Sequence, residues 1–154
     1  MPYSQTHLLS VHALLAADAT RRAFPWLQED ATRAAFLLGA IAPDTRVFSN
    51  QPRESTHFFG IPPLGPRPEA VMLDAYPAFA SAAALDRPHA AFIAGYLTHL
   101  VMDYVWVEQV VMPCLYVEGL PWGARHPNWP HYCLVMAYLE VRASQQLDRS
   151  TGAL

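Results

Sequence analysis

Apolar residues recur along the chain at the spacing of helices, while runs in which apolar and polar residues alternate, as in strands, are absent. The spacing predicts about five helices, over residues 4–22, 29–41, 69–85, 88–112 and 131–147. Ser4 is a candidate N-cap, Pro43 ends the second helix and Pro88 suits the first turn of the fourth. The third helix is expected to bend near Pro77. The pattern therefore predicts an all-α fold.

Two long proline-rich loops lie between the predicted helices, at residues 42–68 and 113–130. The first contains six prolines, which exclude a regular element of useful length. Long loops inside compact domains are uncommon and tend to be functional. The chain has no internal repeat and no linker-like stretch, so we expect residues 1–154 to form a single compact helical domain.

The composition is that of a well-packed globular protein, with 53% hydrophobic and 15% charged residues. The net charge is −3 and the ten Lys and Arg residues form no basic patch. Nucleic acid is therefore not expected as a partner, whereas a small phosphorylated substrate is compatible with this charge. Cysteine occurs only at Cys114 and Cys133, which excludes a disulfide framework and disfavours a thiolate zinc site.

The first residues lack the basic start and the long apolar run of a signal peptide. The longest apolar stretch, residues 90–112, also carries polar side chains at His99, Asp103, Glu108 and Gln109. Because so many polar groups argue against a transmembrane segment, a buried helix fits this stretch better. We expect a cytoplasmic protein.

The clearest candidate for chemistry is the pair His99 and Asp103. On a helix, residues four apart project from one face, and apolar neighbours surround this pair on every side. A carboxylate is costly in such a setting unless a positive group meets it, and a divalent metal would do so. Two other readings stay open: a buried His–Asp hydrogen bond, or an aspartate paired with an arginine of another helix.

Three further residues have the right chemistry to join this pair. Asp44 follows the apolar end of the second helix, and His57 lies in the first loop before two phenylalanines. Taken singly, Asp44 reads as a turn residue bonded to its own backbone, and His57 as a solvated loop histidine. His7 lies near the start of the first helix, and His12, five residues on, faces away from it, so His7 is chosen as the ligand.

Taken in order, four segments resemble the zinc-dependent phospholipase C family, whose fold is shared with P1-type nucleases. These segments are Thr6–Leu9, Phe36–Asp44, Ser55–Phe58 and Gly95–Trp106. The resemblance covers roughly the first 110 residues and implies an α-helical domain with a cluster of up to three zinc ions.

Residue by residue, the resemblance implies a set of metal ligands. The family's first metal position is matched by Asp44, His57, His99 and Asp103. His7 matches a ligand of a second ion, which Asp103 would bridge. We therefore expect these five residues to converge on metal.

The sequence departs from the family at the third ion. The family has a histidine shortly after the bridging aspartate, where this chain has Glu108 and Gln109, and no later His-x-x-x-Glu pair is present. We therefore expect one or two ions, of zinc, although imidazole and carboxylate donors also accept iron, manganese or nickel. The sequence leaves several roles undetermined, those of His12, Glu108, His126, His131 and Glu140.

The function that the resemblance implies is hydrolysis of a phosphate ester, with a small-molecule or lipid substrate. Asp44 would serve as base or ligand, and Arg46 or Arg53, between two ligands in sequence, could contact a phosphate oxygen. Two alternatives stay open. One is a metal-stabilised helical binding or assembly module without phosphodiesterase activity, and the other is a metal-dependent enzyme acting on a non-phosphate substrate.

Overall fold

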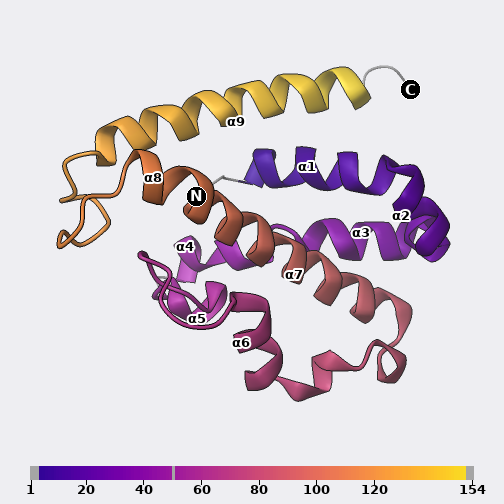
Figure 1. Cartoon of the computed structure of the whole chain (residues 1–154). Coiled ribbons are helices and arrows are strands. Elements are labelled where there is room, and N and C mark those ends of the chain that lie inside the picture. The colour runs from indigo at the N-terminus through magenta and orange to yellow at the C-terminus, as the bar shows by residue number, and fades with distance from the viewer. Residues whose placement is uncertain (1–3, 50, 152–154) are drawn as a thin grey trace.

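The computed structural model describes residues 4–49 and 51–151, and every regular element within them is helical (Figure 1). The longer helices are α1 (Ser4–Ala16), α3 (Asp30–Gly39), α6 (Pro68–Ala75), α7 (Arg87–Trp106) and α9 (Trp129–Thr151). The shorter ones are α2 (Asp18–Ala23), α4 (Arg46–Ser49), α5 (Glu54–His57) and α8 (Met112–Cys114). Single turns are η1 (Pro25–Gln28), η2 (Ala42–Thr45), η3 (Pro77–Ala80), η4 (Ala82–Ala84) and the π-helical η5 (Val107–Val111). The all-α prediction is confirmed.

The helix boundaries differ from the predicted ones where the backbone leaves the helical region. The first predicted helix is two helices, because Ala17 is extended, with φ −65° and ψ 135°. The third ends at Ala75 instead of bending, because Tyr76 precedes a proline and is forced out of the helical region, with φ −129° and ψ 71°. The first proline-rich loop is also less irregular than expected, since η2, α4 and α5 lie within it.

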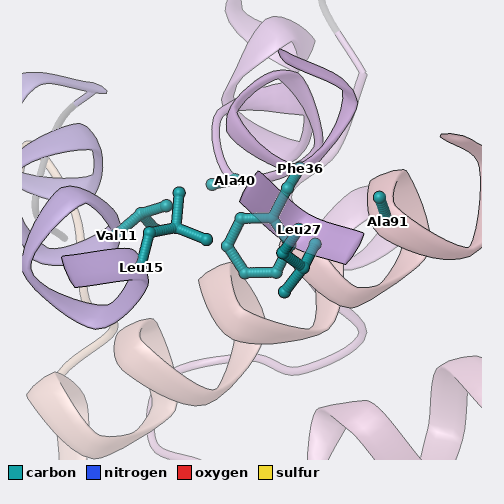
Figure 2. Close-up of a cluster of buried hydrophobic side chains, with 6 residues drawn as sticks. All are labelled: Val11, Leu15, Leu27, Phe36, Ala40 and Ala91. Atoms are coloured by element: carbon teal, nitrogen blue, oxygen red, sulfur yellow. The ribbon is translucent and has the colours of Figure 1, made fainter. Parts of the chain in front are cut away.

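The helix α7 runs through the middle of the molecule (Figure 1). It crosses α3 along most of that helix and also contacts α6 and α1, while α9 lies along α1. Figure 2 shows one part of the core, where apolar side chains of α1, η1, α3 and α7 meet. This cluster consists of Val11, Leu15, Leu27, Phe36, Ala40 and Ala91. A second cluster joins the end of α7 to α9, through Phe59, Tyr104, Val107, Val111, Tyr132 and Met136.

A pair of glycines sets the distance between α3 and α7. A Cβ atom on Gly39 would lie 2.1 Å from the carbonyl oxygen of Phe92, and one on Gly95 would lie 2.1 Å from that of Phe36. These neighbours are backbone atoms and cannot turn aside as a side chain could. Only glycine therefore permits this crossing, which brings the C-terminal end of α3 onto the face of α7 that carries His99.

Among the described residues, one helical stretch, Arg87–Cys114, is long and apolar enough to cross a membrane, by length and composition alone. The same properties are typical of the central helix of a compact domain. In this protein His99 and Asp103 lie on that stretch with no exposed surface.

Gly95→Ala tests the helix crossing. Alanine in place of a helical glycine normally stabilises by about 1 kcal/mol, but the overlap with the Phe36 carbonyl should cost about 3 kcal/mol, so the net change is destabilising. Urea denaturation measures the difference. Gly60→Ala is the control, because a Cβ there meets only a side-chain oxygen at 3.7 Å, and its stability should change by less than about 0.5 kcal/mol. Equal effects of the two substitutions would contradict the close crossing.

Candidate metal centre

All five residues expected to converge do so. His7 comes from α1, Asp44 from η2, His57 from α5, and His99 and Asp103 from α7. Four of them are almost completely buried, while the Asp44 side chain is 22% exposed. Segments far apart in the sequence thus bring three imidazoles and two carboxylates together inside the protein.

Asp103 lies at the centre of the cluster and turns its two oxygens to different partners. Its Oδ2 lies 3.3 Å from Nε2 of His57 and 3.6 Å from Nε2 of His99. Its Oδ1 lies 3.3 Å from Nε2 of His7. The spacing of four between His99 and Asp103 on α7 places them on one face, as expected. One carboxylate can therefore join two groups of donor atoms.

Asp44 closes the first group from the loop side. Its Oδ1 lies 3.4 Å from Nε2 of His57 and 3.9 Å from Nε2 of His99, and those two nitrogens are 3.3 Å apart. The turn η2 that carries Asp44 begins at Ala42, shortly after α3 ends at Gly39, and Pro43 within it cannot continue the helix. Asp44 is thus more than a turn residue bonded to its own backbone.

The spacing of these atoms fits a single divalent ion. Two ligand atoms of a tetrahedral zinc, each about 2.0 Å from the metal, lie about 3.3 Å from each other. In the first group, formed by Asp44, His57, His99 and Asp103, the separations that involve Nε2 of His57 or Nε2 of His99 run from 3.3 to 3.9 Å. Nε2 of His57 and Nε2 of His99 face each other at 3.3 Å, and two nitrogens that both carry a lone pair cannot form a hydrogen bond with each other. A cation between them would bind both lone pairs.

Hydrogen bonds behind the two imidazoles leave their Nε2 lone pairs free for such an ion. Nδ1 of His99 lies 2.8 Å from the carbonyl oxygen of Ala40, to which it donates. Nδ1 of His57 lies 2.9 Å from the hydroxyl of Thr56, which itself donates to the carbonyl of Arg53. The hydroxyl therefore accepts from His57. Partners of this kind orient metal-binding histidines and fix their tautomer.

The short helix α5 is fastened so that His57 stays in place. The hydroxyl of Tyr96, on α7, donates to the carbonyl of Thr56 at 2.6 Å. The helix ends at His57 because Phe58 has a left-handed backbone with φ 61°, which is uncommon for a side chain of this size. Such backbone conformations are found where the surroundings hold a functional residue in place.

His7 forms the second group of donor atoms. Its ring stacks on that of His99, with centroids 3.9 Å apart. Within the described part of the chain, neither of its ring nitrogens has a hydrogen-bond partner, and the same holds for Oδ1 of Asp103. Buried polar atoms without partners are costly, by about 1–3 kcal/mol each. A second cation between His7 and Asp103 would bind to Nε2 of the first and Oδ1 of the second.

The structure also contains an aspartate paired with an arginine, which is one of the two alternatives to a metal that the sequence left open. Nη2 of Arg53 donates to Oδ2 of Asp103 at 2.9 Å, and the guanidinium lies over the ring of Phe59. Burial lowers the pKa of Arg53 to about 10, although the negative charge of Asp103 opposes that shift. One guanidinium does not neutralise two neighbouring carboxylates, so Arg53 supports Asp103 without replacing a metal.

Both carboxylates are held in the ionised form that binds metal. Burial by itself raises the pKa of Asp103, but the imidazoles of His57, His7 and His99 around it outweigh that effect and hold the pKa well below the usual range. Burial also raises the pKa of Asp44, and the imidazoles of His57 and His99 lower it overall. At neutral pH the cluster therefore carries two negative charges.

A cavity of about 630 Å³ opens beside the cluster. Asp44 and His57 form part of its wall, together with Arg46 and Arg53. Nε of Arg46 is buried and has no hydrogen-bond partner within the described residues. Apolar and aromatic side chains complete the lining, among them Phe48, Ile61, Trp122, Trp129 and Tyr132. The buried cluster is thus accessible from a cleft that has both cationic and apolar surface.

The residues whose roles the sequence left undetermined lie outside the cluster. His126 is buried, and its ring nitrogens lie 3.2 Å from the amides of Val117 and Asn128, so it holds the second loop together. His131 is exposed. Burial and the charge of Arg33 lower the pKa of His12. Glu108 lies 4.0 Å from Arg67, and Glu140 binds the start of α1.

The fold and the site define a helical protein with a His/Asp cluster that could hold a metal ion beside a cleft. Comparison with protein families agrees, since the model for zinc dependent phospholipase C matches residues 6–106 of the chain. The protein belongs to this family. No curated protein and no solved structure gives a significant match. The matched region contains all five cluster residues, whereas Trp122, Trp129 and the rest of α9 lie beyond it.

The lowered pKa of Asp103 predicts a pH dependence of stability in the metal-free protein. A carboxyl whose pKa is lower in the folded than in the unfolded state stabilises the fold above the unfolded pKa, and loses that effect as the pH falls through the folded one. The difference in unfolding free energy between the protein and Asp103→Asn should be constant above about pH 5 and shrink below about pH 4.

Urea denaturation at a series of pH values measures this difference. Asp74→Asn, at an exposed carboxylate, is the control and should change stability by less than about 0.5 kcal/mol. A difference for Asp103→Asn that grows as the pH falls would contradict the assignment of an ionised carboxylate.

Proposed function

We propose that the protein is a zinc-dependent hydrolase of phosphate esters. The observation that carries this proposal is that Nε2 of His57 and Nε2 of His99 lie 3.3–3.9 Å from each other and from carboxylate oxygens of Asp44 and Asp103, beside a 630 Å³ cavity that Asp44 and His57 line. Asp44, His57 and His99 would hold a first ion together with Oδ2 of Asp103, and His7 with the other oxygen of Asp103, beside His99, would hold a second. Membership of the zinc-dependent phospholipase C family supports this reading.

A divalent ion in this place supplies a Lewis acid that lowers the pKa of a water and polarises a phosphoryl oxygen. Asp44 contributes a second element of the chemistry. Its Oδ1 faces His57, its Oδ2 is buried without a hydrogen-bond partner within the described residues, and the residue forms part of the cavity wall. Because its pKa is lowered, Asp44 is ionised at neutral pH and can orient an attacking water or accept its proton.

Two arginines give the cavity an affinity for anions. With a divalent ion bound, the charges of Asp44 and Asp103 are balanced, and the positive charges of Arg46 and Arg53 outnumber the one remaining carboxylate of the wall, Glu54. The two guanidinium groups also repel each other, which an anion between them would relieve. Guanidinium groups bind phosphate oxygens through paired hydrogen bonds. Arg46, which forms part of the cavity wall, is the residue we assign to the phosphoryl group.

The apolar part of the cavity fits the organic part of an ester. Trp122, Trp129 and Tyr132 line it, together with Phe48 and Ile61. Aromatic side chains offer a large apolar surface with little loss of conformational freedom. A lipid phosphate ester, or a small-molecule ester with an apolar group, would place its phosphate at the arginines and its apolar group on this surface.

A metal-stabilised helical module without turnover is the second candidate, and one observation favours it. The first group offers four protein atoms, the number that structural zinc sites use, whereas catalytic sites keep one position open. The second position, at His7 and Asp103, shares His99 with the first group and opens the alternative of a catalytic ion there. Zinc bound tightly with no turnover of any phosphate ester would establish the module.

His99→Ala tests the metal centre. Removal of a ligand should weaken zinc binding by more than the 10–100-fold that is typical of groups behind the ligands, so about 100-fold or more is expected. Metal content after dialysis, measured by plasma mass spectrometry, gives the answer. His89→Ala is the control, since His89 is a largely exposed histidine near the start of the same helix. Equal metal content in the two variants would contradict the ligand assignment.

Arg46→Gln tests the proposed activity. The zinc-loaded protein should hydrolyse at least one ester in a panel of phosphomonoesters, phosphodiesters and phospholipids, and a chelator should abolish turnover. In Arg46→Gln, kcat/KM should fall by about 100-fold with zinc content unchanged, because a charged hydrogen bond to the phosphoryl group is lost. Arg87→Gln is the control, at an exposed arginine paired with Glu29. Unchanged kcat/KM in Arg46→Gln would contradict its assignment.

A further inference from the structure

A carboxylate of the last helix binds the start of the first. The Glu140 side chain, on α9, accepts hydrogen bonds from the backbone amides of Gln5 and Thr6, at 3.0 and 3.1 Å. It also accepts from the hydroxyl of Thr6, at 2.6 Å. The first amides of a helix have no partner within the helix, and a negative charge at this end is favourable. Glu140 thus caps α1 from a helix more than 130 residues away in sequence.

The next residue along α1 is His7, which depends on this helix for its position. His7 lies one and two turns before Val11 and Leu15, on the buried face of α1. Unlike His57 and His99, it has no hydrogen bond within the described residues that would orient its ring. The stacking on His99, the contact with Asp103 and the course of the helix hold it. The first turn of α1 therefore determines where Nε2 of His7 lies.

We propose that Glu140 is a positioning residue for the second metal position. By fixing the first turn of α1, it keeps Nε2 of His7 at 3.3 Å from Oδ1 of Asp103. It acts through His7 and belongs to the helix α9, which lies beyond the part of the chain that matches the family. The last helix thereby becomes part of the metal centre. This inference rests on one part of the proposed function, the binding of metal, and not on hydrolysis.

Zinc titration separates the two ions. The protein, first stripped of metal, is titrated with zinc in competition with a chromophoric chelator, which yields the number of ions and the affinity of each. The unaltered protein should bind two ions. Glu140→Ala should bind the second ion about 10–100-fold more weakly and the first with unchanged affinity, because groups behind a ligand have effects of this size. Glu140→Gln keeps one acceptor oxygen, so its affinity for the second ion should lie between those of the unaltered protein and Glu140→Ala.

The control must weaken a helix start without touching His7. Asp86→Ala does so, because the Asp86 side chain caps α7 by accepting from the amide of His89 at 2.9 Å. Both ions should bind to this variant as they do to the unaltered protein, although thermal unfolding shows a comparable loss of stability. If Glu140→Ala does not fold, by far-UV circular dichroism, Glu140→Gln decides with the same readout.

Three different results of the zinc titration would overturn the positioning role of Glu140 or the proposed function on which it rests. Unchanged affinity for the second ion in both Glu140 variants would overturn the positioning role. Binding of only one ion to the unaltered protein would overturn it too, while leaving the first ion of the proposed function intact. Binding of no ion at all would overturn the proposed function itself.

Discussion

The structure depends on the burial of one carboxylate. Asp103 has no exposed surface, and an uncompensated charge inside a protein costs several kcal/mol. The chain compensates it from every side, with His99 on the same helix, His7 from the first helix, and His57 and Arg53 from the first proline-rich loop. Arg53 and His57 thereby hold that loop against α7, through their contacts with Asp103. The packing of residues 42–49 and 51–57 against α7 and the geometry of the site therefore depend on the same contacts.

The helix crossing makes this arrangement possible. Because Gly39 and Gly95 let the backbones of α3 and α7 meet, the carbonyl of Ala40 reaches Nδ1 of His99 and fixes the direction of its other nitrogen. The turn after α3 then delivers Asp44 to the same place. Packing and chemistry are thus coupled, since a larger residue at the crossing would displace two of the candidate ligands together.

Much of this could be predicted from the sequence, and the reasons are local. Helical spacing indicated the all-α fold, and a spacing of four placed His99 and Asp103 on one face. The convergence of all five residues followed from the family resemblance. Contacts between distant segments left no such signal: nothing near Glu140 points to α1, and nothing in the second loop points to the aromatic lining of the cavity. Metal ligation itself, the single domain and the cytoplasmic location stay predictions.

The central claim is that the cluster around Asp103 is a metal centre. A crystal structure of the zinc-loaded protein, with diffraction data collected on both sides of the zinc absorption edge, tests it most directly. The account predicts an anomalous peak within about 2.0–2.2 Å of donor atoms of Asp44, His57, His99 and Asp103. A fully loaded protein whose anomalous peaks all lie outside the reach of His99 and Asp103 would contradict it.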